Sequence, residues 1–373
     1  MRREIFAVSF VSFSLPFVIA ACSSDGGEND GARSGTGSGS VELLVAASDY
    51  SSSRVCAAPG GCKEGADLGK DPMLAETNGR AFFLARDNDL LFELDPATAV
   101  PIARVSVRPD GVQRVANPHD VAAAKDGSLF VPLYNIGRIA IVKDGKVDAT
   151  IDLSTYDADG NPQADAIRIV DVAGSEKAFV TLERLDDNDK LLSKQSSQML
   201  RIDVATRAVE AAIDLAGRNP FNPMSFADGA LFMAEPGNFD AAKEAGAGIE
   251  RFEVATSTTK LVVPETDLEG SVAEVAVADQ CGAAIVAGPE PSVNPTSVVT
   301  FHAREGKPSA PILGPTAGYD LQGLAWRGNM LYVGNRRDLR IHVFERDGVS
   351  CTVHDTGRTL PLEQRPVALR PAR

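Results

Sequence analysis

NPHDVAAAKDGSLFVPLYN, residues 117–135, reads as a polar loop, a short apolar strand, a tight turn, a second apolar strand and another polar loop. The turn is KDG, and Asp and Gly supply the backbone dihedrals that a hairpin turn needs. The stretch therefore predicts an antiparallel hairpin. It also contains His119 and Asp120, so it is either an active-site segment or one copy of a structural repeat.

The second strand of this hairpin recurs along the chain with a large apolar residue at the same place. The marked residues are Leu44, Phe83, Phe130, Phe179, Phe232, Ile285 and Tyr332. Successive members lie 39, 47, 49, 53, 53 and 47 residues apart. A third strand such as RIAIV or MLRID follows each of them, and a second tight turn then leads to a fourth strand. The repeat is a four-stranded antiparallel meander.

The copies must pack against one another, because a single meander leaves both of its apolar faces uncovered. Four-stranded units of this length pack radially as the blades of a β-propeller. The strand of Leu44 lacks an inner strand before it, whereas RPVALRPAR, residues 365–373, resembles an inner strand with nothing after it. We therefore predict an all-β, seven-bladed propeller over residues 41–373, closed by pairing of its N- and C-terminal strands.

Several segments carry a resemblance to known repeats. LFVPLYN, LFELDPATA, LRIDVATRA and LYVGN resemble the YVTN/NHL-like repeats of bacterial β-propellers. NPHDVA, TIDLSTYDADGNP and VTLERLD resemble exported propellers of unassigned function found in surface-associated bacterial lipoproteins. The resemblance implies a propeller fold and says little about activity, because propellers include both binding modules and enzymes.

The N-terminus reads as an export signal. In residues 1–22, MRREIFAVSFVSFSLPFVIAAC, two arginines precede an uncharged and mostly apolar run. The run ends in IAAC, which resembles the lipobox of bacterial lipoproteins, in which the cysteine receives the lipid. This predicts lipidation of Cys22, and Ser23 rather than Asp after it favours the outer membrane. The alternative is an ordinary secretory signal with Cys22 as an odd thiol.

Composition predicts a disordered tether and limits the kinds of partner that the chain can bind. Residues 23–40 are rich in Gly and Ser with almost no apolar side chain, and they predict a disordered tether. The formal net charge of −14 disfavours nucleic acid and anionic lipid as partners. No other segment reaches the roughly 18 uncharged apolar residues of a membrane span. Contact with the membrane is therefore expected through the lipid anchor only.

Four cysteines remain after Cys22, an even number that favours disulfides in an exported chain. Cys56 and Cys62 enclose AAPGG, which permits a tight covalent loop. The repeat places Cys281 and Cys351 near short turns on one face of neighbouring blades. We predict the pairs Cys56–Cys62 and Cys281–Cys351.

The two faces of the predicted propeller differ in their loops. The turns from first to second and from third to fourth strand are uniformly short, and they define the short-turn face. The other connections define the long-loop face, and their longest members are 108–118, 154–165, 183–197, 235–248 and 288–296. Elaborated loops on a rigid scaffold are where binding usually evolves. The long-loop face is therefore the predicted functional face.

His119 and Asp120 lie where a blade-connecting loop enters an inner strand, so they should face the central channel at the long-loop face. They are a candidate catalytic or ligand-binding pair. The alternative is that they hydrogen-bond neighbouring loops and fix a blade junction. The chain has neither a G-x-S-x-G nucleophile elbow nor an H-E-x-x-H motif.

YDADGNPQAD, residues 156–165, offers a tentative calcium site. Asp157, Asp159 and Asn161 alternate along the loop and carry the hard oxygen ligands that calcium prefers. Pro162 and Arg168 stand where an EF-hand loop requires Gly and Glu, so the alternative is a solvated turn with local hydrogen bonds. Calcium is the one cofactor that the sequence suggests.

A ring of polar side chains is a further candidate ligand site at the channel mouth. Its members follow the second strands of their blades, and they are Asn135, Arg184, Asn238, Asn335 and Arg336. The alternative is that the asparagines start their loops by bonding to the backbone.

Two functional hypotheses remain. The leading one is a membrane-tethered binding or scaffold module that presents its long-loop face to a protein, peptide or glycan. The alternative is a lactonase-like hydrolase at the channel mouth, which would use His119 and Asp120, with or without a bound calcium ion. Whether the protein is an enzyme is left open.

Overall fold

A computed structural model describes residues 40–372 except 66–67, 240–243, 289–294 and 349. The signal peptide with Cys22 and nearly all of the tether lie outside the described residues, so those predictions stay predictions. In the described part, no helix is long and apolar enough to cross a membrane.

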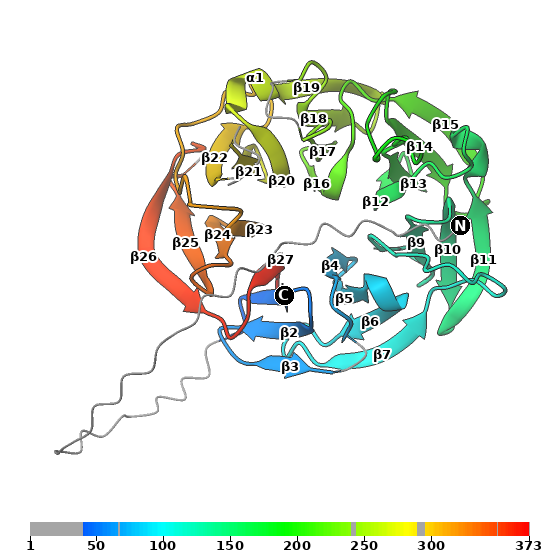
Figure 1. The fold of residues 1–373 in the computed structure, drawn as a ribbon, viewed down its shortest axis with the longest axis horizontal. Coiled ribbons are helices and arrows are strands. Elements are labelled where there is room, and N and C mark those ends of the chain that lie inside the picture. The colour runs from blue at the N-terminus through cyan, green and yellow to red at the C-terminus, as the bar shows by residue number, and fades with distance from the viewer. Residues whose placement is uncertain (1–39, 66–67, 240–243, 289–294, 349, 373) are drawn as a thin grey trace. The chain divides into compact units, whose positions relative to one another are not determined.

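Seven antiparallel sheets form a closed ring of blades (Figure 1). From the channel outwards, the first three blades are β4 (Pro72–Thr77), β5 (Arg80–Ala85), β6 (Leu90–Leu94), β7 (Pro101–Ser106); β8 (Ala122–Ala123), β9 (Leu129–Leu133), β10 (Arg138–Lys143), β11 (Lys146–Asp152); and β12 (Ala164–Val172), β13 (Ser175–Leu182), β14 (Gln198–Asp203), β15 (Val209–Asp214). The fourth and fifth are β16 (Phe221–Ala227), β17 (Ala230–Glu235), β18 (Gly248–Glu253), β19 (Thr258–Pro264); and β20 (Ser271–Ala278), β21 (Cys281–Ala287), β22 (Thr296–His302).

The sixth blade is β23 (Leu321–Arg327), β24 (Met330–Asn335), β25 (Arg340–Arg346), β26 (Val353–Pro361). The seventh is β27 (Pro366–Pro371), β1 (Leu43–Ser48), β2 (Ser53–Ala58), β3 (Cys62–Glu64). The short helix α1 (Glu265–Leu268) and the 3-10 turns Arg86–Asn88 and Ser154–Tyr156 lie in loops. In the fifth blade, a segment that bridges β22 only at Pro308 and Leu313 replaces a regular fourth strand.

The ring closes as predicted. β27 is the innermost strand of the seventh blade and pairs with β1, with Val45 opposite Leu369 and Ala46 opposite Ala368. The last strand of the chain therefore joins the first. The all-β propeller of seven blades is confirmed, with the irregular fifth blade as its one departure.

The core lies between neighbouring blades. The seven residues that mark the repeat are all buried, with exposed fractions of 0 to 2%. The second strand of a blade has another blade against each face, so both of its sides are apolar. One such contact is the edge-to-face pair of Phe179 in β13 and Phe252 in β18, whose ring centroids are 5.7 Å apart.

The short turns have the predicted chemistry. Asn78–Gly79, Asp144–Gly145 and Asp228–Gly229 have positive φ at both residues. This is the type I′ geometry that matches the twist of a two-residue hairpin. The same face of the ring therefore carries short, rigid connections.

Both predicted disulfides are present. Cys56 in β2 is bonded to Cys62 in β3, and Cys281 in β21 is bonded to Cys351, which precedes β26. The second bond links the fifth and sixth blades. It spans 70 residues, so it restricts the unfolded chain more than the first bond, which spans 6.

Candidate functional site at the long-loop end of the channel

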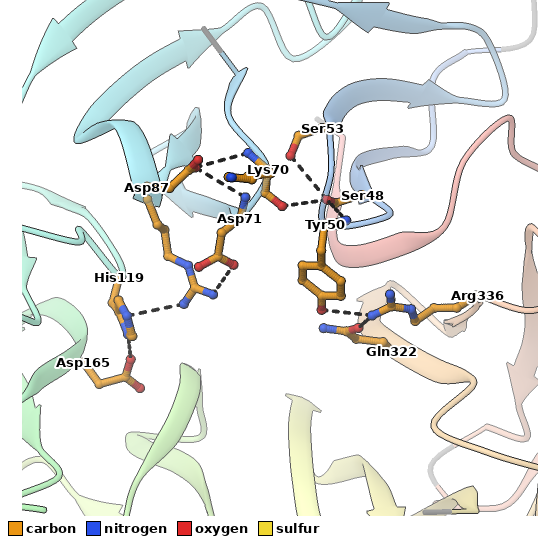
Figure 2. A network of polar contacts seen from close by, with 11 residues as sticks. Ser48, Tyr50, Ser53, Lys70, Asp71, Asp87, His119, Asp165, Gln322 and Arg336 are labelled. Atoms are coloured by element: carbon orange, nitrogen blue, oxygen red, sulfur yellow. Dashed lines mark hydrogen bonds and ion pairs between the residues drawn. The ribbon is translucent and has the colours of Figure 1, made fainter. Parts of the chain in front are cut away.

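Polar side chains from the first three blades meet at the long-loop end of the channel. Second strands end on this face and inner strands begin there, so residues at these two positions become neighbours. Arg86 follows β5, His119 precedes β8 and Asp165 lies at the start of β12. Figure 2 shows His119 and Asp165 pointing toward one another from different blades.

Both ring nitrogens of His119 contact neighbouring side chains. Its Nδ1 lies 2.5 Å from Oδ1 of Asp165, and its Nε2 lies 3.4 Å from Nη1 of Arg86. Arginine can only donate, so Nε2 accepts and Nδ1–H donates to Asp165. The ring also stacks on Tyr134, with centroids 4.1 Å apart. Burial and the Arg86 charge lower the pKa of His119, so the imidazole is neutral at physiological pH.

The contacts continue on either side of this histidine. Arg86 forms an ion pair of 2.5 Å with Asp71, which directly precedes β4. The hydroxyl of Tyr134 donates to Glu183, which directly follows β13, at 2.5 Å. Burial and the neighbouring Asp165 charge raise the pKa of Glu183 well above its usual range. We call these six residues, Asp71, Arg86, His119, Tyr134, Asp165 and Glu183, the mouth network.

Asp120 points elsewhere. It is 1% exposed, and it accepts hydrogen bonds from Nη1 of Arg168 and from the backbone N–H of Ile167, each at 3.0 Å. The structure therefore separates the two residues of the predicted pair. The carboxylate that contacts His119 belongs to Asp165, and Asp120 instead fastens β8 to β12.

Four of the candidate polar residues hold loops. Nδ2 of Asn135 donates to the carbonyl of Val115, and Arg184 donates to the carbonyls of Tyr156 and Ser196. Oδ1 of Asn238 accepts from the N–H of Ser193, and Oδ1 of Asn335 accepts from the N–H groups of residues 337 and 338. These four side chains have protein partners, and their role in ligand binding stays a prediction.

Arg336 lies at the mouth itself. Its Nη1 donates to the hydroxyl of Tyr50 at 3.0 Å and to the side chain of Gln322. Its guanidinium lies 4.8 Å from the centre of the Tyr50 ring, and the Tyr50 side chain is exposed. Figure 2 shows this group on the other side of the view from His119.

The proposed calcium ligands have other contacts. Asp157 accepts from Nε2 of Gln195 at 2.8 Å, and Oδ1 of Asp159 accepts from the N–H of Asn161 within the turn. Oδ1 of Asn161 is buried and accepts no hydrogen bond from the described residues. Within the described ranges, no group of three or more His, Cys, Asp or Glu could hold a metal ion. This donor set does not fit calcium well, and we derive no chemistry from it.

A pair of buried carboxyl groups lies under the long loop of the fourth blade. Glu235 ends β17 and Glu250 lies in β18, and both are fully buried. Glu250 accepts from the N–H groups of Ala216 and Gly217. Burial, followed by the charge of Glu250, raises the pKa of Glu235 well above its usual range. The protonated form of Glu235 is therefore favoured, and neither of its carboxyl oxygens has a hydrogen-bond partner among the described residues.

The sequence carries a signal for the mouth network at two positions of the repeat. Arg86, Tyr134 and Glu183 each follow the last residue of a second strand, and Asp71 precedes the first residue of an inner strand. Charged and phenolic residues at these two repeat positions account for four of the six members.

No protein-family model matches the sequence, and no curated protein matches it. Solved structures do match its fold. A putative 6-phosphogluconolactonase from Bacteroides uniformis superposes with a TM-score of 0.59 at 13% identity, covering 89% of this chain and 99% of that chain. Virginiamycin B lyase from Staphylococcus aureus gives 0.55 at 10% identity, covering 81% and 88%. The WD40 repeats of RRP9 give 0.55 at 9% identity, covering 88% of each chain.

At these identities the matches show the fold alone. The chain is a seven-bladed β-propeller, a class that includes lyases, lactonase-like proteins and WD40 proteins. Its repeat type as YVTN/NHL-like stays a prediction.

Proposed function

We propose that this protein is an exported, lipid-anchored binding module that takes a protein or peptide partner on its long-loop face. The N-terminal sequence supports export and anchoring through Cys22. The ring of blades supports the loops as a rigid platform, and the WD40 propeller of RRP9 has the same architecture.

The distribution of exposed apolar side chains carries this proposal. Eight large hydrophobic residues are exposed among the described residues, and five lie in long-loop connections. These five are Tyr50, Val115, Leu191, Phe239 and Leu339. Aromatic and apolar side chains presented to solvent from loops supply the anchors of protein interfaces. Because these loops rise from different blades, a partner would contact several of them at once.

The hydrolase hypothesis has weaker support. A general base needs a ring nitrogen that can reach a substrate, and both nitrogens of His119 already have protein partners. Its side chain is also only 12% exposed. These contacts support a blade-fastening role for His119. His119→Ala should therefore leave partner binding largely intact.

Site-specific photo-crosslinking in intact cells tests the proposal. A photoreactive residue is placed at Leu191 or Leu339, and at Ile102 in the outer strand β7 as an exposed apolar control. We expect crosslinked products from the two loop positions and none from position 102. Protease should remove the added mass. Equal crosslinking from all three positions, or added mass removed only by glycosidases, would contradict a polypeptide partner on this face.

Membrane fractionation tests the anchor separately. The wild-type chain should sediment with the outer membrane, and Cys22→Ser should lose that association. Cys351→Ser provides a control for loss of a cysteine without loss of the proposed lipid site. Retention of the Cys22→Ser variant in the membrane would overturn the anchor.

A further inference from the structure

A cavity lies within the channel, at the end opposite the mouth network. Its volume is about 480 Å³, within the range of small-molecule sites. Inner strands surround the channel (Figure 1), and the parts of β4, β12, β16, β20, β23 and β27 that lead to the short-turn face line this cavity. Among the described residues, none from a loop of the long-loop face contributes to its lining.

Arg370 brings a positive charge into this cavity. Its Nη1 donates to the carbonyl of Leu369, and no carboxylate of the described residues lies within ion-pair distance, although Asp120, Glu274 and Glu76 attract the guanidinium at longer range. Burial and the charge of Arg168 lower the pKa of Arg370. The Arg370 side chain is half-buried, and a guanidinium has five N–H donors, so a charge in this position without a close partner is costly. A ligand anion beside Arg370 would offset this cost.

Arg168 lines the same cavity but is already neutralised. Its Nη1 donates to Asp120 at 3.0 Å and to the carbonyl of Ile167 at 2.8 Å. Arg370 is therefore the cation that is left for a ligand.

The cavity also presents negative charge. The two oxygens of Glu274 accept backbone N–H groups from Gly323 and Leu324 at 2.8 and 2.9 Å. Glu274 forms no ion pair with a cation of the described residues, although it interacts electrostatically with Arg370 at longer range. Glu76 lines the cavity as well. A ligand with only negative charge would meet these carboxylates unfavourably.

The rest of the lining includes apolar surface. Phe226 is 47% exposed at the short-turn end of β16, and Trp326 lies on β23 with its indole N–H fixed by the carbonyl of Ala276. The cavity thus combines a cation, carboxylates and aromatic surface.

We propose that this cavity binds a free α-amino acid with an apolar side chain. Arg370 takes the carboxylate, and Glu274 accepts the ammonium group. The side chain lies against Phe226 and Trp326. This site is separate from the long-loop face and goes beyond the proposed partner binding.

Calorimetry with three related probes tests this assignment. The purified full chain is titrated with L-phenylalanine, with 3-phenylpropanoate, which lacks the ammonium group, and with 2-phenylethylamine, which lacks the carboxylate. Hydrogen bonds to charged groups contribute about 1.5–3 kcal/mol, so each analogue should bind at least about tenfold more weakly than L-phenylalanine. No binding of L-phenylalanine, or equal binding of 3-phenylpropanoate, would overturn the proposal.

Two variants make the test specific. Arg370→Gln should abolish binding, whereas Arg340→Gln, which removes an exposed arginine of β25, should not change it. Glu274→Gln should remove the preference for L-phenylalanine over 3-phenylpropanoate, and this readout does not depend on the stability of the Arg370 variant. A preference that survives Glu274→Gln would contradict the assigned ammonium contact. Crosslinking from the long-loop face does not depend on any of these outcomes.

Discussion

The two ends of the channel use charge differently. At the long-loop end, Arg86 lies against Asp71 of its own blade and against His119 of the next, and His119 lies against Asp165 of the blade after that, so charges and dipoles meet directly. At the short-turn end, Arg370 and Glu274 face a common cavity without forming an ion pair. Polar groups that contact one another fasten the ring, and polar groups left apart around a cavity are available to a ligand. The elaborated loops alone do not reveal this second arrangement.

Removing a carboxylate from the mouth network should have the largest effect. Asp165 is 5% exposed, and Asp165→Ala would leave the Nδ1–H of His119 without its hydrogen-bond acceptor. We expect a loss of about 1–3 kcal/mol in the free energy of unfolding, as for a buried donor that loses its acceptor. Urea denaturation measures it, with Asp214→Ala in the outer strand β15 as control. A loss equal to that of the control would contradict the fastening role.

The carboxyl pair of the fourth blade should make stability depend on pH. The pKa of Glu235 is raised in the folded state, so its contribution is present at low pH and is lost as pH rises through the folded-state value. Glu235→Gln keeps the uncharged form at all pH values. Between pH 5 and pH 9 the wild-type chain should lose at least about 1 kcal/mol more than this variant. Parallel stability curves for the two chains, measured by urea denaturation, would refute the protonated pair.

Arg370→Gln should behave in the opposite way to Asp165→Ala. Because Arg370 has no ion-pair partner among the described residues, its removal breaks no such pair. We expect the free energy of unfolding to increase, by less than about 1 kcal/mol. Thermal and urea denaturation without added amino acid measure this. A loss of several kcal/mol would mean that Arg370 fastens the ring, as the mouth network does.

Substitution in an exposed loop should have the smallest effect on folding. Leu191 is half exposed, and Leu191→Ser should change the free energy of unfolding by less than about 0.5 kcal/mol. The same change should reduce crosslinking from position 339 if one partner covers both loops. Unchanged crosslinking would place Leu191 outside the interface.

The fold followed from the sequence because the repeat has a simple physical cause. A second strand covered on both faces must be apolar, so residues such as Phe130 and Phe232 mark each blade. Ring closure followed from one incomplete unit at each terminus. Cys281 and Cys351 could be paired because blade geometry places equivalent turns on one face.

The sites were harder to predict, because they depend on how blades are rotated against one another. The sequence put Asp120 beside His119, yet the inner strand turns the two side chains to different neighbours. Asp165 reaches His119 from 46 residues away and from the next blade. The pattern of RPVALRPAR predicts an inner strand, but it does not predict the direction in which Arg370 points. Loop length favours the long-loop face as the functional face, whereas inner strands line the cavity around Arg370.

Ring closure by β27 makes the proposed receptor a property of the whole ring. Arg370 lies on β27, which pairs with β1 to complete the seventh blade, whereas Glu274 lies on β20 of the fifth blade. A chain in which β27 is detached from β1 would have neither a closed ring nor both charges of the cavity. Ligand occupancy would therefore report whether the ring is closed, and the ligand would hold in place the strand that closes it.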